Sequence, residues 1–227
     1  MASCETKKGS AKGEGAERAA LTDELRRRIS EHEIPPGSKL KEQEIAREFA
    51  VSRTRVREVL ATLELRGLVE RIHNRGAVAR RLELNQVFEI YDVREVLEGL
   101  AVRRAVENEN PDTWAEFLNA CDSEFEQRVV SGQIELYEKE FNRLRKRIIE
   151  AADNPVLTSM LDSVQDQTQM IMRRVLVLPG RVERGICDLR RVLEAMCAGR
   201  AEEAEQLRRM GIRGAIDDLK RYQRFVL

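Results

Sequence analysis

Residues 51–59 read Val51-Ser52-Arg53-Thr54-Arg55-Val56-Arg57-Glu58-Val59, and this stretch decides the fold of the chain. A small hydroxyl residue that can cap a helix comes near its start, and three arginines follow at alternate positions. An apolar run comes next, at Leu60, Leu63, Leu65 and Leu68. Such a helix offers cations and short polar side chains in its first turn, while its other face packs on a core. The stretch therefore predicts the start of a helix that contacts DNA.

Two helices are predicted before this stretch. Residues 18–33 have apolar side chains at helical spacing, and the turn at residues 34–37 ends that helix with two prolines and a glycine. Residues 41–49 form a second, shorter helix. Ser52 then caps the third helix, which runs to about residue 66 and ends where Gly67 can adopt a left-handed conformation.

A β-hairpin is predicted directly after the third helix. Residues 68–72 alternate as a short strand, His73-Asn74-Arg75-Gly76 form a turn, and residues 77–79 form the returning strand. Three helices followed by a hairpin make a winged helix-turn-helix, which we expect over residues 17–81.

The rest of the chain is expected to be mainly α. Residues 81–86 act as a linker, and residues 82–227 form an all-α antiparallel helical bundle. Proline and glycine breaks divide the bundle into six expected helices, at about residues 84–108, 112–130, 133–152, 155–177, 181–197 and 200–224. Residues 1–16 are rich in Gly, Lys, Ser and Ala and are expected to form a disordered tail.

The charge is distributed unevenly along the 227 residues. The chain has 40 basic and 40 acidic residues, but residues 1–81 contain 18 basic and 13 acidic residues. Within them, residues 52–81 contain eight arginines and three glutamates. The remaining residues are net acidic, so we expect the N-terminal part to meet a polyanion and the C-terminal part not to.

Several protein classes are disfavoured by the composition. The four cysteines form no CxxC pair and no zinc-ligand spacing with histidine, so we expect free thiols in a reducing cytoplasm. There is no apolar signal core and no stretch of membrane-spanning length. The absence of a glycine-rich phosphate loop, of a Ser/His/Asp arrangement and of any histidine after residue 73 argues against an enzyme. No cofactor is expected.

These features together resemble the GntR family of transcriptional regulators, of the FadR type, with a six-helix FCD effector domain like that of the VanR subgroup. The motifs in the N-terminal part are Pro36-Gly37-Ser38-Lys39-Leu40, Glu44-Ile45-Ala46, Val51-Ser52-Arg53-Thr54, Val56-Arg57-Glu58-Val59-Leu60 and Leu65-Arg66-Gly67-Leu68-Val69. Those in the C-terminal part are Tyr91–Glu98, Phe141-Asn142, Ala152-Asp153-Asn154-Pro155 and Val192-Leu193-Glu194-Ala195. The resemblance implies a homodimer that binds a palindromic operator and is released by a small organic acid.

The resemblance also implies which residues contact DNA. Arg53 and Arg57 occupy the family's main contact positions, and an arginine fork can bind a guanine edge or a phosphate. Arg55 stands where the family usually has proline, and Gln43 either reads adenine or makes no contact. The full expected set is Gln43, Ser52, Arg53, Thr54, Arg55, Arg57, His73, Asn74, Arg75 and Gly76. For His73, a solvated turn position remains an equal alternative.

Relatives of this subgroup often hold a divalent metal with one Asp and three His. Those positions fall on Glu138, Asn142, Leu189 and Gly211 in this chain. Leucine and glycine offer no side-chain donor, and the only histidines are His32 and His73. The sequence therefore predicts no tightly bound metal.

An anionic effector without a metal needs another anchor in the C-terminal domain. Arg94 is the natural candidate, although an intrahelical pair with Glu98 is the competing interpretation. Arg145, Arg173 and Arg190 on later helices are weaker candidates, chosen because they fall near apolar neighbours. The expected effector-binding residues are Arg94, Glu98, Glu138, Asn142, Arg145 and Arg173.

Two functional hypotheses remain open at this stage. The first is a DNA-binding transcriptional regulator, which we expect to be a repressor. A small organic acid, expected to be a carboxylate, would bind in the C-terminal domain and control it. The second is an architectural or protein-interaction module whose C-terminal bundle serves only dimerisation. A steep salt dependence of DNA binding would separate the first from the second.

Overall fold

A computed structural model describes the backbone of residues 6–226 and the side chains of residues 15–223 apart from Arg173. Its contacts divide the chain into two compact units. The first unit contains the residues up to Leu82 together with Asp166–Met170, and the second contains Glu83–Gln165 and the residues from Ile171 onward.

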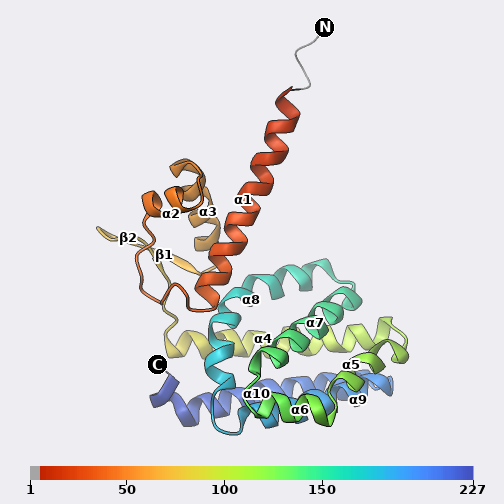
Figure 1. The fold of residues 1–227 in the computed structure, drawn as a ribbon. Coiled ribbons are helices and arrows are strands. Elements are labelled where there is room, and N and C mark those ends of the chain that lie inside the picture. The colour runs from red at the N-terminus through yellow and green to blue at the C-terminus, as the bar shows by residue number, and fades with distance from the viewer. Residues whose placement is uncertain (1–5, 227) are drawn as a thin grey trace. The chain divides into compact units, whose positions relative to one another are not determined.

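The first unit is a winged helix-turn-helix, as the sequence predicted (Figure 1). Its elements are α1 (Thr6–Ser30), α2 (Glu42–Glu48), α3 (Arg53–Leu65), β1 (Val69–Ile72) and β2 (Gly76–Ala79). The two strands pair antiparallel, with Val69 opposite Ala79 and Ile72 opposite Gly76. This hairpin, with the turn at residues 73–75, is called the wing below.

The sequence of α3 explains both its ends and its orientation. Ser52 caps it, because its side chain accepts a hydrogen bond of 3.2 Å from the backbone N–H of Arg55. Four side chains on one face are completely buried or nearly so, at Val56, Val59, Leu60 and Leu63. Gly67 has a φ of +70°, the left-handed conformation predicted after the helix.

Two features of the first unit differ from the sequence-based expectation. Helix α1 extends back to Thr6, into the segment predicted as a tail, since lysine, alanine and glutamate between the glycines favour a helix. The first five residues of that predicted tail lie outside the described part. In addition, the segment before α2 pairs with β2 through a bridge between Lys39 and Val78, which the sequence pattern did not indicate.

The second unit is a helical bundle, which confirms the predicted all-α class (Figure 1). Helix α4 packs against α7 and α10, and α9 packs against α10. The elements are α4 (Leu84–Asn108), the 3-10 turn η1 (Pro111–Trp114), α5 (Ala115–Ala120), α6 (Ser123–Val130), α7 (Ile134–Ala152), α8 (Pro155–Leu176), α9 (Arg181–Cys197) and α10 (Ala201–Val226).

The single helix predicted for residues 112–130 is wrong, because the segment is divided into η1, α5 and α6. Cys121 leaves the helical region with φ −91° and ψ 42°. Asp122 then starts a new helix, since its carboxylate accepts a hydrogen bond of 2.8 Å from the backbone N–H of Phe125. A short acidic side chain competes for backbone donors in this way and interrupts a helical pattern.

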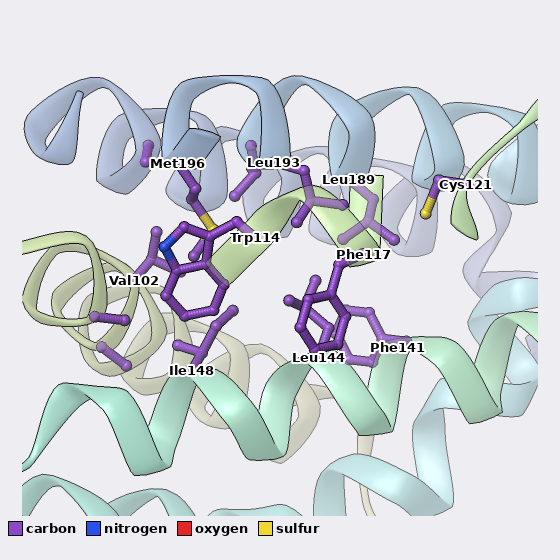
Figure 2. Packing of buried hydrophobic residues seen from close by; sticks show 14 of the residues in the cluster. Val102, Trp114, Phe117, Cys121, Phe141, Leu144, Ile148, Leu189, Leu193 and Met196 are labelled. Carbon is purple, nitrogen blue, oxygen red and sulfur yellow. The ribbon is translucent and has the colours of Figure 1, made fainter. Parts of the chain in front are cut away.

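One hydrophobic core joins α4, η1, α5, α7 and α9 (Figure 2). Trp114 is fully buried in it, with its ring centroid 6.3 Å from that of Phe117. Figure 2 shows Ile148 and Met196 reaching Trp114 from different helices. Among the described residues, no helix is both long and apolar enough to cross a membrane.

Candidate functional site

A basic groove lies in the first unit between α2, the start of α3 and the wing. Six cationic side chains and two carboxylates line it, which leaves an excess of positive charge. The charged lining residues are Lys39, Lys41, Glu42, Glu44, Arg47, Arg53, Arg71 and Arg75. Such a groove attracts a polyanion and repels a second basic surface.

The start of α3 directs its polar side chains away from the core. The Ser52 cap fixes the first turn, and Val56 is completely buried on the inner face. As a result, the side chains of Arg53 and Arg57 are 60% and 58% exposed, and Thr54 is exposed beside them. These are the positions at which a recognition helix presents forks and hydroxyls to base edges and phosphates.

A carboxylate on α2 holds both arginines. Nε of Arg57 donates to Oε2 of Glu42 at 2.8 Å, and Nη2 of Arg53 lies 3.5 Å from the same oxygen. Glu42 itself is 23% exposed. The sequence analysis did not find Glu42, although it named the adjacent Gln43. The contact joins two helices, so no spacing along one helix could have indicated it.

The side chain of Arg55 is less exposed to solvent than those of Arg53 and Arg57. Its side chain is only 19% exposed, and Nη1 lies 3.6 Å from Oε2 of Glu58. The added cation noted in the sequence is therefore mostly covered in this structure.

The wing tip presents four exposed residues, His73, Asn74, Arg75 and Gly76. Asn74 and Gly76 have φ values of 64° and 81°, a left-handed conformation that asparagine and glycine tolerate. All of the tip except His73 lines the basic groove, together with the exposed Gln43. The structure thus gathers predicted DNA-contact residues from α2, α3 and the wing around one groove.

The second unit contains a small cavity of about 30 Å³ between α4, α7, α8, α9 and α10. Three charged residues line it, Glu98, Arg145 and Arg208. The remaining lining residues are apolar: Ala101, Val102, Phe141, Leu144, Ile148, Ile149, Leu161, Leu189 and Val192. This cavity is called the bundle cavity below.

Glu98 forms the centre of a buried charge cluster at the bundle cavity. Nε of Arg94 donates to its Oε1 at 2.8 Å, and Nε of Arg208 donates to its Oε2 at 3.0 Å. Burial opposes ionisation of Glu98, but Arg208, Arg94 and Arg145 outweigh it and lower the pKa of Glu98 to about 2. Glu98 is therefore ionised, and Arg94 forms the intrahelical pair that the sequence analysis left as an alternative.

Arg145 differs from the other two arginines. Its Nε is buried and has no hydrogen-bond partner among the described residues. Burial lowers the pKa of Arg145, against the raising effect of Glu98. The cavity wall thus includes a guanidinium whose hydrogen-bonding capacity is incompletely used, which is costly in a buried position.

Two of the other predicted effector residues, Glu138 and Asn142, do not line the cavity. Glu138 is half-buried and Asn142 is exposed on α7. Nη2 of Arg190 donates to the backbone carbonyl of Cys121 and to Glu126. The side chain of Arg173 lies outside the described residues.

Arg208 was missed by the sequence analysis. A signal for it exists on α10, because Arg208 lies four residues after the fully buried Ala204 and four before Ile212, which is 3% exposed. An arginine on that stripe must face the core.

The residues at the metal positions implied by the resemblance do not fit a metal. Leu189 is 5% exposed and offers only an apolar wall to the cavity, and Gly211 has no side chain. Among the described residues, no three His, Cys, Asp or Glu side chains group closely enough to hold a metal ion.

Comparison with known protein families gives a match for each of the two units. The FCD domain model matches residues 89–213, and the model of bacterial regulatory proteins of the gntR family matches residues 18–78. The solved structure of E. coli McbR/YncC is similar in fold, with a TM-score of 0.75 at 21% identity over 91% of this chain and 98% of that one.

Two curated relatives are similar in sequence. The Nta operon transcriptional regulator of Aminobacter aminovorans is 31% identical over 135 residues, which are 58% of this chain and 62% of that protein. The gluconate operon transcriptional repressor of Bacillus subtilis is 43% identical over 83 residues, 37% of this chain and 34% of that protein. The matched parts thus span less than two thirds of either relative. Both are transcriptional regulators and neither is named as an enzyme. This chain belongs to the GntR family of bacterial transcriptional regulators and carries an FCD domain over residues 89–213.

Proposed function

We propose that the protein is a cytoplasmic repressor that binds a palindromic operator as a homodimer and is released from it by a small organic acid. The observation that carries the proposal is the pair of exposed arginines, Arg53 and Arg57, in the first two turns of a capped helix beside a basic groove. Arginine forks in that position suit guanine edges and phosphates.

The wing and α2 support the same proposal. Arg75 and Asn74 at the wing tip, and Gln43 on α2, line the groove with Arg53. A winged head of this kind places its helix in the major groove and its wing against the backbone or the minor groove. The name of the Bacillus subtilis relative, a transcriptional repressor, supports repression.

Self-association is supported by an apolar stripe on α4. Val93 and Val96 are 48% and 50% exposed, on the face opposite the buried Arg94 and Glu98. The two valines are spaced i, i+3 and therefore share one helix face. Two copies that pair through this stripe would present two heads to the two halves of a palindrome.

Control by an effector is supported by the bundle cavity. Its lining is largely apolar with a few convergent charged groups, the kind of lining that small-molecule sites have. An effector that binds the DNA-free arrangement more tightly would lower the affinity for the operator.

The proposal is tested by selecting binding sites for the full-length protein from a random pool of duplex DNA. We expect an enriched palindromic motif, whose affinity falls steeply with salt because several phosphates are contacted. A pool that shows no enriched motif after repeated selection would refute the proposal.

A further inference from the structure

We propose that the basic groove separates affinity from sequence selectivity. Three of its cations, Lys39, Arg47 and Arg75, bind the phosphate backbone of duplex DNA whatever its sequence. The arginines held by Glu42 supply the sequence preference. The inference rests on the DNA-binding part of the proposed function and divides its residues between two tasks. Lys39 and Arg47 are not among the DNA-contact residues expected from the sequence.

Three of the six cations that line the groove have a carboxylate partner. The pairs are Lys41 with Glu44, Arg71 with Glu64 and Arg53 with Glu42, at 2.7, 3.0 and 3.5 Å. A phosphate that binds one of these cations must compete with a carboxylate that is already in place. The pairing therefore reduces what these three cations contribute to binding a duplex of arbitrary sequence.

The other three cations, Lys39, Arg47 and Arg75, have exposed side chains without an ion-pair or hydrogen-bond partner among the described residues. They come from three places, namely the segment before α2, α2 itself and the wing tip. Only counterions balance their charges in the free protein. A DNA phosphate that takes the place of those counterions releases them into solution, and this release favours binding to any duplex.

The backbone that carries Lys39 is fixed to the wing. The N–H of Leu40 donates to the carbonyl of Ala77 at 2.9 Å, and the N–H of Ala79 donates to the carbonyl of Ser38 at 2.9 Å. Lys39 itself forms the bridge to β2 described above. The ammonium group is therefore attached to a segment that pairs with the wing, beside the groove.

Arg47 and Arg75 are also anchored. Arg47 lies four residues after Gln43 on α2, so the two side chains share the helix face that lines the groove. Ile45, which is 7% exposed, packs α2 on the core. The N–H of Arg75 donates to the carbonyl of Ile72 at 3.0 Å and closes the wing turn. The three cations border a groove of about 500 Å³, which has room for a stretch of sugar-phosphate backbone rather than a single ion.

Arg53 and Arg57 are suited to the second task. Both are held by Oε2 of Glu42, so a DNA site must offer them enough to replace that contact. A guanine edge offers two acceptors that match an arginine fork, whereas other bases offer a poorer match. Exchange of the carboxylate for a base edge therefore discriminates between sequences, which phosphate binding by an unpaired cation does not.

Fluorescence anisotropy with the full-length protein tests this division. The operator selected by the wild-type protein and a random duplex are titrated at several salt concentrations between about 50 and 200 mM. Lys39→Gln and Arg47→Gln should each lower the affinity for both duplexes by the same factor, roughly 3- to 10-fold, and should reduce the slope of log affinity against log salt by about 1. The ratio of the operator affinity to the random-duplex affinity should stay at the wild-type value.

Two further variants make the comparison specific. Arg57→Gln should lower the affinity for the operator more than that for the random duplex, so that their ratio falls at least about 5-fold. Arg18→Gln is the matched control, because it removes the same charge from an exposed position on α1 that does not line the groove. It should change neither the salt slope nor the ratio. Circular dichroism checks that each variant is folded.

The outcomes separate this inference from the proposed function. The inference is overturned if Lys39→Gln and Arg47→Gln leave the salt slope unchanged, if they lower the affinity ratio as much as Arg57→Gln does, or if Arg18→Gln acts as they do. If selection from random DNA yields no motif but both groove variants still weaken binding to random duplex, phosphate binding by Lys39 and Arg47 stands and the proposed operator binding fails.

Discussion

Nε of Arg57 on α3 donates to Oε2 of Glu42 on α2 at 2.8 Å, so an arginine of the proposed recognition helix is held by a carboxylate in the same unit. The same oxygen lies 3.5 Å from Nη2 of Arg53. Any phosphate or guanine that binds these arginines must compete with Glu42 or share them with it. The carboxylate thus fixes the position of two cations and lowers the net positive charge around them.

Replacement of Glu42 by glutamine should therefore strengthen binding to non-operator DNA. Glu42→Gln removes a negative charge from the groove and frees both arginines for phosphates. We expect a severalfold rise in affinity for random duplex at low salt, with a smaller rise for the selected operator, because arginines that are less fixed discriminate less. Fluorescence anisotropy measures both affinities.

Glu48→Gln provides the matched control. It removes the same charge from α2, but Glu48 pairs with Arg28 and does not line the groove. An equal effect of the two substitutions would mean that general charge, rather than the contact with Arg57, determines the affinity.

A second prediction concerns Glu98, the shared partner of Arg94 and Arg208. Glu98→Gln should lower the free energy of unfolding by roughly 3 kcal/mol, because the buried Arg94 and the partly buried Arg208 lose their counter-charge. Urea unfolding at neutral pH measures the change. Glu107→Gln on the same helix removes an exposed ion pair with Arg103. This substitution should change the free energy of unfolding by less than about 1 kcal/mol.

The effect of Glu98 should depend on pH. Because its pKa is about 2 in the folded protein against an ordinary value of 4.5, ionised Glu98 stabilises the folded state above pH 4.5. This stabilisation is lost as the pH falls from 4.5 toward 2. The difference in unfolding free energy between wild type and Glu98→Gln should shrink over that window, and a constant difference would contradict the assignment.

A third prediction concerns the stability cost of Arg145. Arg145→Met removes an incompletely bonded cation and keeps an apolar stem, so we expect it to raise stability by about 1 kcal/mol in the absence of ligand. For a chain of this size the melting temperature should rise by roughly 2–4 °C. Arg147→Met removes the hydrogen bond of 2.6 Å from Nη2 of Arg147 to Oε1 of Glu109, and it should not raise the melting temperature. Destabilisation by Arg145→Met would show that Arg145 is fully bonded in the free protein.

A fourth prediction concerns the exposed stripe of α4. Val96→Glu places a charge in the proposed dimer contact and should weaken self-association at least about 10-fold, as measured by sedimentation velocity. The fold should be unaffected, because Val96 is half exposed. Val177→Glu makes the same change at a 68% exposed valine outside α4 and should leave the association unchanged. Equal effects, or a wild-type protein that is monomeric, would contradict the proposed dimer.

Local signals in the sequence were sufficient for most of the fold. Ser52 and Gly67 marked the ends of α3, and the turn before Gly76 marked the wing, because capping and left-handed conformations depend on single residues. The break at Cys121 was missed, since the following Asp122 is also compatible with a helix interior when the apolar pattern continues through it.

Contacts between elements could not be predicted in the same way. Glu42 was overlooked because its partners lie on the next helix, 11 and 15 residues later. Arg94 and Glu98 were recognised as a pair because they lie on one helix, but Arg208, which completes the cluster from α10, was not. The distinction between Arg94 and Arg145 needed the packing, since both sit among apolar neighbours in the sequence.

The most direct test of the central claim is the affinity of Arg57→Ala for the operator selected by the wild-type protein. Fluorescence anisotropy should show a loss of roughly 10- to 100-fold and a reduced preference over random duplex, because a base- or phosphate-binding fork is removed. Arg104→Ala, which removes a cation from the second unit, should bind as the wild type does. If Arg57→Ala bound the operator as tightly and as selectively as the wild type, α3 would not be the recognition helix.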